Sequence, residues 1–314
     1  MEYTGLINKY KVNRPLTDEE RRNRLDPAKR LEVEPNYYSA TIRMNSRYLE
    51  VADKYYGWKG ALTFVTVALL LVGVFTTWVS ATIFLGGFAE NVDDRTTHLV
   101  FGGVPLLMGI ALVCALLWLL ARECFRLTHY PIRLQRDQRM VHVFRLDGTV
   151  LSVPWDKVFF TLGRGNRAFG IQTWDVRGHV LADDRVTVVE SFAFALSWPE
   201  IAGLHRYWEY VRRYMEDGPG AIVPYTLAYL PIAERRESWA FGLMRLALNL
   251  PGLTFVQVIM APAFLLFSFG RWLAMRTCRI PVWPAHIEAA CAIDAGDPFA
   301  KDARSNPSQL WKVM

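Results

Sequence analysis

The sequence predicts a membrane protein of the α + β class: a two-helix transmembrane hairpin, a cytoplasmic β-rich domain closed by a helix, and a third apolar segment. Three observations lead to this fold class. Residues 60–89 and 99–121 carry no charged side chain. Short β-rich pieces follow from residue 129 onward and give way to a helical period. A last uncharged stretch covers residues 246–270.

The chain of 314 residues divides into five predicted parts. They are a cytoplasmic N-terminal segment at 1–58, a transmembrane hairpin at 59–121, a cytoplasmic domain at 129–220, a third membrane-associated segment at 239–280 and a polar tail at 281–314.

Two long apolar stretches predict the hairpin. Spans of about 61–85 and 99–121 are long enough, because a helix needs roughly 20 residues to cross the hydrocarbon core. The polar sequence ENVDDRTTH at 90–98 separates them, with three acidic residues and one arginine. A hairpin buried in a soluble core is the alternative, but core helices rarely run this far without charge.

Basic residues indicate the orientation of the hairpin. Residues 1–59 carry twelve lysines and arginines against nine acidic residues, and five arginines follow between residues 122 and 139. Cytoplasmic flanks of membrane proteins are enriched in basic residues, so both ends of the hairpin are predicted inside and the loop at 90–98 outside. Topology thus explains much of the net charge of +6, and no nucleic-acid partner is expected.

The N-terminal segment shows two local signals. Thr17 to Glu20 has the form of a capping box and predicts a short helix through Arg24. Residues 37–58 suggest an extended piece followed by a helix that leads into the membrane. Aromatic side chains are common at membrane interfaces. The predicted interfacial anchors here are Tyr55, Tyr56 and Trp58.

The middle of the chain predicts about seven short strands. Their sequences are PIRLQRD, MVHVFRL, TVLSVP, KVFFTL, AFGIQTWDV, GHVLAD and RVTVVESF. Asp147-Gly148 is a hairpin turn signal between the second and third of these. Gly163 and Gly165 are expected to break the chain after the fourth. The sequence GRGNRAFG suggests a turn there, because it lacks the GKS/T ending of a phosphate loop.

One amphipathic helix is predicted after the strands. The sequence SWPE at 197–200 has capping-box form, and Gly218 is expected to end the helix. An apolar stripe lies between them, at Ile201, Leu204, Trp208, Val211 and Met215. Seven strands followed by one helix resemble a pleckstrin-homology-like (PH-like) domain, whose final helix closes one end of a bent β-sandwich. An SH3-like or other small barrel would produce a similar pattern.

Basic residues of this domain are candidates for contact with lipid headgroups or with a protein partner. They are Arg133, Arg136, Arg139, Arg145, Lys157, Arg164 and Arg167. A basic side chain close to an anionic leaflet gains about 1 kcal/mol from the attraction. A solvated strand face with the usual basic bias beside a membrane is the simpler explanation.

The third apolar segment allows two topologies. Its 25 uncharged residues would suffice for one crossing. Pro262 lies in the middle and predicts a bend, and arginines flank the segment on both sides. Both features favour a re-entrant or in-plane hairpin over a single span. Further predicted interfacial anchors are Trp272, Arg276 and Trp283.

Signals for chemistry are weak in this sequence. The four cysteines form no CxxC pair and the six histidines are scattered, so no metal or other cofactor is predicted. No nucleophile–base pair and no paired carboxylates stand out, so an enzyme is not predicted. The two hairpin spans contain no ionisable side chain, which argues against a transporter or channel.

Four stretches together resemble an uncharacterised family of bacterial inner-membrane proteins. They are RMNSRYLEVADKYYGWKG, FRLDGTVLSVPWDKVFF, LSWPEIAGLHRYWEYVRRYMEDGP and RWLAMRTCRIPVWP. Genes of this family often stand beside type VI secretion components and their toxic effectors. The resemblance covers about residues 30–300. It implies a multi-pass inner-membrane protein with an immunity or accessory role, and it transfers no catalytic residue.

The sequence therefore predicts a non-enzymatic, membrane-anchored interaction protein whose N-terminus and β domain are cytoplasmic. Its expected partners are the lipid bilayer and a protein, either an effector or a secretion component. An anionic-lipid-binding or membrane-organising PH-like module is the alternative. An enzyme acting on lipid or cell-wall precursors is a third hypothesis, but it would need polar residues at membrane depth.

Overall fold

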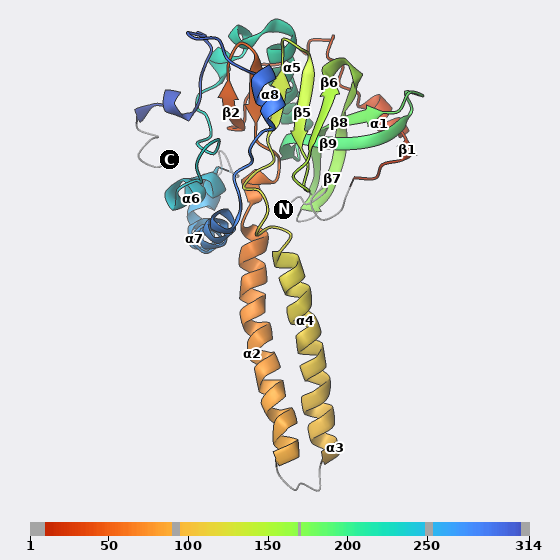
Figure 1. Cartoon of the computed structure of the whole chain (residues 1–314), viewed down its shortest axis with the longest axis vertical. Helices are drawn as coiled ribbons and strands as arrows, with labels where there is room; N and C mark the ends of the chain where they lie inside the picture. Colours follow the sequence, from red (N-terminus) through yellow and green to blue (C-terminus); the bar gives the residue numbers. More distant parts are fainter. Residues whose placement is uncertain (1–9, 90–94, 169–170, 249–253, 309–314) are drawn as a thin grey trace. The chain divides into compact units, whose positions relative to one another are not determined.

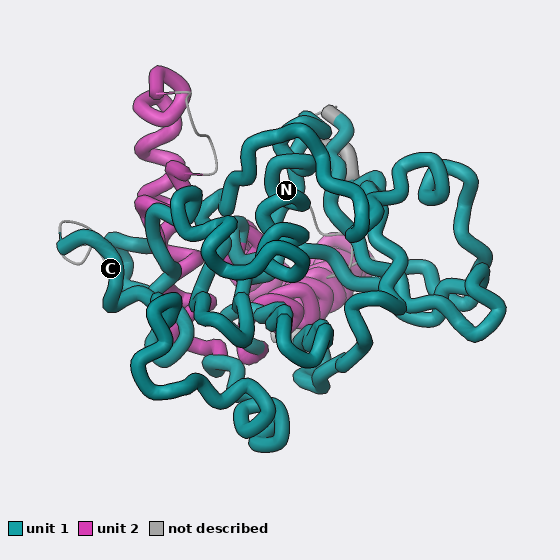
Figure 2. The backbone as a smooth tube through the Cα atoms, turned by 90° about the horizontal axis from the view of Figure 1, so that it is seen from above, with its two compact units in different colours: residues 1–58, 127–241, 279–314 teal, residues 59–126, 242–278 magenta. Residues whose placement is uncertain are grey.

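The computed structural model of the chain describes residues 10–89, 95–168, 171–248 and 254–308. The chain forms two compact units (Figure 2). Unit 1 comprises residues 1–58, 127–241 and 279–314, and unit 2 comprises residues 59–126 and 242–278.

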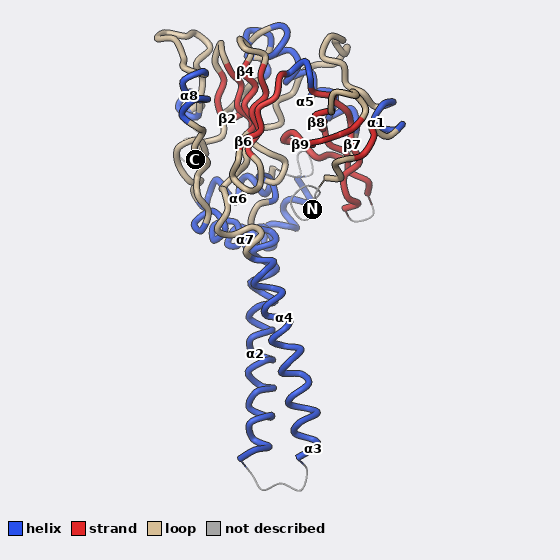
Figure 3. The backbone as a smooth tube through the Cα atoms, turned by 45° about the vertical axis from the view of Figure 1, so that its right-hand side comes forward, coloured by secondary structure: helices blue, strands red, loops and turns tan. Residues whose placement is uncertain are grey.

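Unit 1 contains two antiparallel sheets (Figure 3). The four-stranded sheet has the order β1-β9-β8-β7, formed by Arg14–Pro15, Thr187–Trp198, Ile171–Leu181 and Val158–Ala168. The five-stranded sheet has the order β2-β3-β4-β5-β6, formed by Thr41–Met44, Tyr48–Val51, Ile132–Gln135, Met140–Phe144 and Val150–Pro154. Strands β2 and β3 precede unit 2 in the sequence, so the predicted domain at 129–220 supplies only part of this sheet.

Helices complete unit 1. The α-helices are α1 (Asp18–Arg22), α5 (Ile201–Asp217) and α8 (Ala285–Ala290). Short 3-10 turns occur at Tyr56–Trp58, Trp155–Lys157, Pro219–Ala221, Val223–Tyr225 and Ala303–Ser305. The predicted apolar stripe of α5 is buried from Leu204 to Met215, whereas Ile201 at its start is 37% exposed. In the core the Trp208 ring lies 4.9 Å from Phe160 and 5.8 Å from Trp155, between centroids.

The two predicted capping boxes have different outcomes. At α1 the prediction is confirmed: the Thr17 hydroxyl accepts from the Glu20 backbone N–H, and the Glu20 carboxylate accepts from the Thr17 N–H. At α5 it is wrong. Ser197 and Trp198 belong to β9, and Glu200 occupies the N-cap without a side-chain hydrogen bond. Strand β9 continues to Trp198, so Ser197 pairs within the sheet and does not cap the helix.

Fewer strands form after residue 129 than predicted. The glycines that were expected to end strands lie inside them. Gly163 and Gly165 lie inside β7, and the two pieces AFGIQTWDV and GHVLAD merge into β8. A Cβ atom at Gly178 would lie 2.4 Å from the Phe192 ring. Gly178 thus lets Phe192 pack directly over the strand. The Asp147-Gly148 turn forms as predicted, with Gly148 at φ +89°.

Within residues 37–58, where an extended piece and a helix were predicted, the stretch 41–51 forms a β-hairpin. Strands β2 and β3 pair antiparallel, from Thr41 opposite Val51 to Met44 opposite Leu49. The Asn45 side-chain oxygen makes the turn by accepting from the backbone N–H groups of Arg47 and Tyr48, both at 2.8 Å. This asparagine turn returns the chain into a second strand.

Unit 2 consists of apolar helices (Figure 1). They are α2 (Ala61–Ala89), α3 (Arg95–His98), a π-helical turn (Leu99–Gly103), α4 (Val104–Leu120), α6 (Trp239–Ala247), which begins in unit 1, and α7 (Thr254–Thr277). Helices α2 and α4 run side by side as a hairpin (Figure 1). The described part of the chain has three helices long and apolar enough to cross a membrane: Tyr56–Gly86, Thr96–Leu120 and Thr254–Thr277.

Helix α7 meets α2 at a close crossing. It runs across the start of α2 and not alongside the hairpin (Figures 1 and 3). A Cβ atom at Gly270 would lie 2.5 Å from the Phe64 Cβ and 2.6 Å from the Gly60 carbonyl oxygen. The Phe64 and Phe267 rings pack edge to face, 5.0 Å apart. Helix α7 also continues through Pro262, so the two separate halves expected around this proline do not form.

A buried carboxylate closes the base of the hairpin. Glu123 follows α4 and accepts from the backbone N–H groups of Gly60 and Thr63 at 2.8 and 2.6 Å, and from the Thr63 hydroxyl at 2.6 Å. The first N–H groups of a helix have no partner within the helix and attract negative charge. Glu123 therefore caps the start of α2 although it follows α4 in the sequence.

The Gly60–Gly270 crossing predicts a strong size limit at position 270. In Gly270→Ala the new methyl group would push α7 away from α2, and overpacking of this kind costs about 1–3 kcal/mol. We expect the melting temperature of the purified full-length protein in detergent to fall by several degrees. Gly86→Ala is the matched control, because a Cβ atom at Gly86 would meet no other atom within 4 Å. Equal melting temperatures for the two variants would contradict the close crossing.

Candidate functional site

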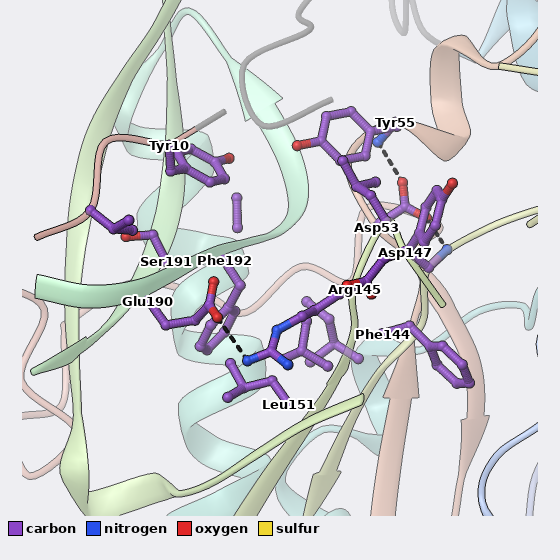
Figure 4. Close-up of a pocket in the computed structure, with 16 residues that line it drawn as sticks. Tyr10, Asp53, Tyr55, Phe144, Arg145, Asp147, Leu151, Glu190, Ser191 and Phe192 are labelled. Atoms are coloured by element: carbon purple, nitrogen blue, oxygen red, sulfur yellow. Dashed lines mark hydrogen bonds and ion pairs between the residues drawn. The ribbon is translucent and has the colours of Figure 1, made fainter. Parts of the chain in front are cut away.

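A pocket of about 300 Å³ lies between the two sheets of unit 1 (Figure 4). One wall comes from β5, β6 and the turn that joins them, and the facing wall comes from β9. Most of its lining is apolar, with Val143, Leu151 and Phe192 from the two sheets. Tyr10 and Val12 add to the lining ahead of β1. The pocket can therefore receive an apolar group of a ligand or partner.

One ion pair crosses the pocket. Arg145, in the turn after β5, donates from Nη2 to Glu190 Oε2 in β9 at 2.7 Å (Figure 4). The two side chains are 38% and 34% exposed. Pairs this accessible to water add little to stability, so the structure does not depend on this contact. A ligand that carries charge meets one positive and one negative group here.

Asp53 fixes the backbone beside the pocket. Its carboxylate accepts from the backbone N–H groups of Tyr55, Tyr56 and Tyr130. The aspartate thereby holds the exit of β3 against the chain that enters β4. Tyr55 lines the pocket, and burial raises the pKa of its hydroxyl well above its usual value. The phenol therefore stays protonated and acts as a hydrogen-bonding, uncharged wall.

A buried charge cluster lies next to Tyr10 and Tyr55. Lys54 Nζ lies 2.7 Å from Asp175 Oδ2, and Arg177 Nε lies 2.5 Å from Asp175 Oδ1. Burial alone would raise the pKa of Asp175, but Lys54 and Arg177 hold it below its usual value. The Tyr10 ring lies 5.4 Å from Lys54 Nζ and 5.0 Å from the Arg177 guanidinium carbon. The cluster is compensated internally and fixes Tyr10 at the pocket.

A serine, a histidine and a glutamate also align at this site. Ser191, which lines the pocket, lies 2.7 Å from His179 Nδ1, and His179 Nε2 lies 3.3 Å from Glu20 Oε1. Arg14 binds the same Glu20 through two hydrogen bonds of 2.6 and 2.8 Å. Burial raises the pKa of Glu20, but His179, Arg14 and Thr17 together lower it far below its usual value. This glutamate is thus permanently ionised.

The same serine–histidine contact recurs in the other sheet, which gives it a structural explanation. His142 and Ser152 face each other across β5 and β6, with Nδ1 and Oγ 2.8 Å apart. His179 and Ser191 face each other across β8 and β9 in the same way. Cross-strand pairs of this kind stabilise sheets. Both contacts use the histidine Nδ1 atom and join directly opposed residues, so we interpret both as sheet contacts.

Comparison with known proteins adds one finding. Residues 109–295 match the Family of unknown function (DUF6708). This match covers more than half of the chain. The chain belongs to the DUF6708 family. No curated protein matches it, and no solved structure matches it. The DUF6708 match contains β4 to β9 and α5 to α8, and therefore most of the pocket wall.

Arg133 departs most from its predicted place on an open basic face. It is 0% exposed and lies between the Tyr48 and Trp283 rings, 4.3 and 4.5 Å from their centroids. It pairs with Glu50 at 2.8 Å and with Glu288 at 3.0 Å. A guanidinium enclosed in this way cannot meet a lipid headgroup or a partner. The sequence around Arg133 does not indicate whether its side chain faces solvent or the core.

Other basic residues predicted to face a partner also form ion pairs with acidic side chains. The further pairs are Arg139 with Asp156 and Glu216, Arg145 with Glu190, and Arg164 with Glu19. Arg136 is half-buried near Gly218, and Lys157 is exposed. The side chain of Arg167 lies outside the described part of the structure. The described members therefore do not form one uncompensated basic face.

The predicted interfacial anchors fall into two groups. Tyr56 and Trp283 are 1% and 7% exposed inside unit 1, where Trp283 lies 4.6 Å from the Phe144 ring. Tyr55 and Trp58 are half-buried. Trp272 and Arg276 are exposed on α7, with the guanidinium 5.8 Å from the indole ring. Burial removes Tyr56 and Trp283 from any lipid surface, and the pair on α7 stays a prediction.

The pocket itself escaped prediction from sequence. Its lining includes Tyr10, Asp53, Arg145 and Glu190, which belong to four distant stretches of the chain. No spacing rule links residues so far apart.

The enclosure of Arg133 predicts a large loss of stability on its removal. Arg133→Met leaves the buried Glu50 carboxylate without its positively charged partner, which costs about 3–5 kcal/mol. Arg139→Met is the matched control, because Arg139 is 39% exposed and exposed pairs contribute at most about 1 kcal/mol. We expect a large fall in melting temperature for the first variant and a small one for the second. Equal losses would contradict the structural role of Arg133.

The burial of His142 predicts that the stability of the fold decreases in acid. Burial, then the charges of Arg133 and His286, lower the pKa of His142 from 6.5 to about 4. Between these pH values the unfolded chain binds a proton that the folded chain excludes, so stability falls as the pH drops. The loss reaches about 3 kcal/mol. We expect the melting temperature to fall less between pH 7 and pH 4.5 in His142→Gln than in the parent protein. Identical pH profiles would contradict this assignment.

Proposed function

We propose that this chain is a non-enzymatic, membrane-anchored binding protein. In this proposal unit 2 is the anchor, and the pocket of unit 1 receives part of a protein partner. The observation that carries the proposal is the apolar surface of the hairpin. On α2, Leu71 is 70% exposed and Trp78 is 62% exposed, and on α4, Leu107 is 70% exposed.

Lipid is the environment that this surface requires. Soluble proteins rarely expose contiguous apolar patches of more than a few hundred Å², and burial of apolar surface gains roughly 25 cal/mol per Å². The exposed residues of α2 and α4 extend along both helices, and each helix is long enough to cross a bilayer. A hydrocarbon core satisfies them, and the closed hydrogen-bonding of a helix satisfies the backbone there.

The pocket supports binding of a protein partner. Its volume of about 300 Å³ is at the lower limit of small-molecule sites. A cavity of this size suits one or two apolar side chains, and partner side chains that fill such cavities often dominate the energy of an interface. Arg145 and Glu190 can orient a polar backbone or a charged side chain next to them.

The narrower proposal concerns location and partner. Resemblance to bacterial inner-membrane proteins encoded beside type VI secretion genes supports the inner membrane. The basic flanks of the hairpin support a cytoplasmic unit 1. On this basis we propose an immunity or accessory role, with a toxic effector or a secretion component as the partner. The PH-like architecture of unit 1 belongs to the same proposal, supported by two antiparallel sheets followed by α5.

Binding of anionic lipid by the β-rich unit receives less support. That alternative needs uncompensated basic side chains, whereas Arg133, Arg139, Arg145 and Arg164 pair with acidic residues. Ion pairs of this kind neutralise the charge that would attract an anionic leaflet.

Co-expression tests the immunity proposal. The full-length chain is expressed in bacteria together with the toxin encoded beside its gene, and growth and co-purification are measured. We expect the chain to restore growth and to retain the toxin through membrane solubilisation. Leu151→Trp fills the pocket and should reduce the retained toxin at least tenfold. Val189→Trp is the control, because Val189 is 41% exposed on β9 and does not line the pocket.

Two outcomes would contradict the proposal. Failure of the parent protein both to restore growth and to retain the toxin rules out the immunity role. Equal retention by the Leu151→Trp and Val189→Trp variants, with equal melting temperatures, rules out the pocket as the binding site.

A further inference from the structure

We infer that α7 lies in the plane of the membrane at its surface, so that the chain crosses the bilayer twice and not three times. The inference rests on the proposed anchoring of unit 2. It assigns the exposed face of α7 to the boundary between lipid headgroups and acyl chains. Length and composition alone would make α7 a third span.

Residues on both sides of α7 build the same folded unit. Trp283 Nε1 donates to Glu50 Oε2 at 3.1 Å, and Arg133 pairs with Glu288 at 3.0 Å. Further along, the Asn306 side chain makes two hydrogen bonds of 2.7 Å with the Tyr229 backbone. Partners in one packed unit share one side of a membrane. The segment between residues 241 and 279 must therefore cross the membrane an even number of times.

Two crossings are excluded by length. A spanning helix needs about 20 residues. Helix α6 has only 9 residues, and α7 is one continuous helix of 24 residues. Among the described residues of this segment, 242–248 and 254–278, only α7 is thus long enough to span. A re-entrant loop would require α7 to break, and its helix continues through Pro262. Since an even number of crossings is required and two are excluded, this segment does not cross the membrane.

The exposed face of α7 suits a lipid surface. Its exposed apolar residues recur at spacings of three, four and seven along one stripe: Phe255 (78%), Val258 (68%), Ile259 (60%), Leu266 (57%) and Phe269 (55%). On the other face Phe264, Arg271 and Met275 are buried. Helices with one continuous apolar face bind in the plane of a membrane interface.

Polar groups place the crossing of α7 and α2 at headgroup depth. Helix α7 meets α2 at Gly60, directly before the first residue of α2, and Arg271 donates to the Lys59 carbonyl oxygen at 3.2 Å. The buried Glu123 carboxylate lies at the same end of the hairpin. Charged groups are costly at the bilayer centre and are common near its surface. Trp272 and Arg276 are exposed on α7, as expected for interfacial side chains.

Continuity with the hairpin favours lipid over a protein as the occupant of this face. Helix α7 packs directly on α2, whose apolar surface we assign to the bilayer. A bilayer that surrounds α2 therefore also reaches the helix that rests on its first turn.

Cysteine accessibility tests the topology in the full-length chain. Glu234→Cys and Asp294→Cys flank the segment, and the original side chains are 76% and 79% exposed. Each variant is treated with a membrane-impermeant maleimide in spheroplasts and in inverted vesicles, with the parent protein as background for its native cysteines. We expect both positions to react from the same face, in inverted vesicles. Reaction from opposite faces would overturn the inference.

Thr96→Cys, in α3 between the two hairpin helices, separates this inference from the proposed function. We expect it to react in spheroplasts, and we expect the chain to stay in the membrane pellet after carbonate extraction. Loss from the pellet, or reaction of Thr96→Cys from the same face as Asp294→Cys, would refute the hairpin anchor itself. An exposed Thr96→Cys with Glu234→Cys and Asp294→Cys on opposite faces would refute only the in-plane α7.

Nitroxide labels at Val258→Cys and Phe269→Cys test the occupant of the α7 face. An in-plane helix in lipid places both labels at the same shallow depth, accessible to dissolved oxygen more than to a water-soluble nickel complex. A label shielded from both reagents would mean that protein covers this face, and it would overturn the lipid assignment.

Discussion

Arg133 is the side chain at which all three stretches of unit 1 meet. Glu50 comes from the stretch before the hairpin, Arg133 from the stretch after it, and Glu288 from the stretch after α7. Tyr48 and Trp283 enclose the guanidinium from both sides. Buried charges are tolerated only where their partners are in place. The five-stranded sheet and the C-terminal stretch therefore depend on each other.

This dependence limits the membrane topologies that the proposed anchor allows. Stretches that share one buried ion pair share one side of a membrane, so each apolar insertion between them must return to the side where it began. In the proposed topology the α2–α4 hairpin returns by crossing twice, and α7 remains on its starting side. Glu123 supports the first insertion because it caps α2 at the point where the chain comes back. The proposed anchor and the proposed binding unit thus follow from one constraint.

Sequence reasoning succeeded where a local cause decides the structure. Thirty residues without charge have few alternatives to a long apolar helix, and Thr17 and Glu20 satisfy each other within one turn. It failed where the cause is distant. The partner Glu288 lies 155 residues beyond Arg133, so nothing near Arg133 reveals its burial. The pocket was unpredictable for the same reason, because separate stretches supply its walls.

The position of Trp283 and Glu288 has a consequence for biosynthesis. A ribosome makes these two residues after α2, α4 and α7, yet they complete the enclosure of Arg133. Until they are made, Arg133 has its ion pair with Glu50 but lacks the Trp283 ring and the Glu288 carboxylate. A chain that ends before residue 283 therefore leaves the Arg133 guanidinium uncovered on the side that Trp283 and Glu288 would close.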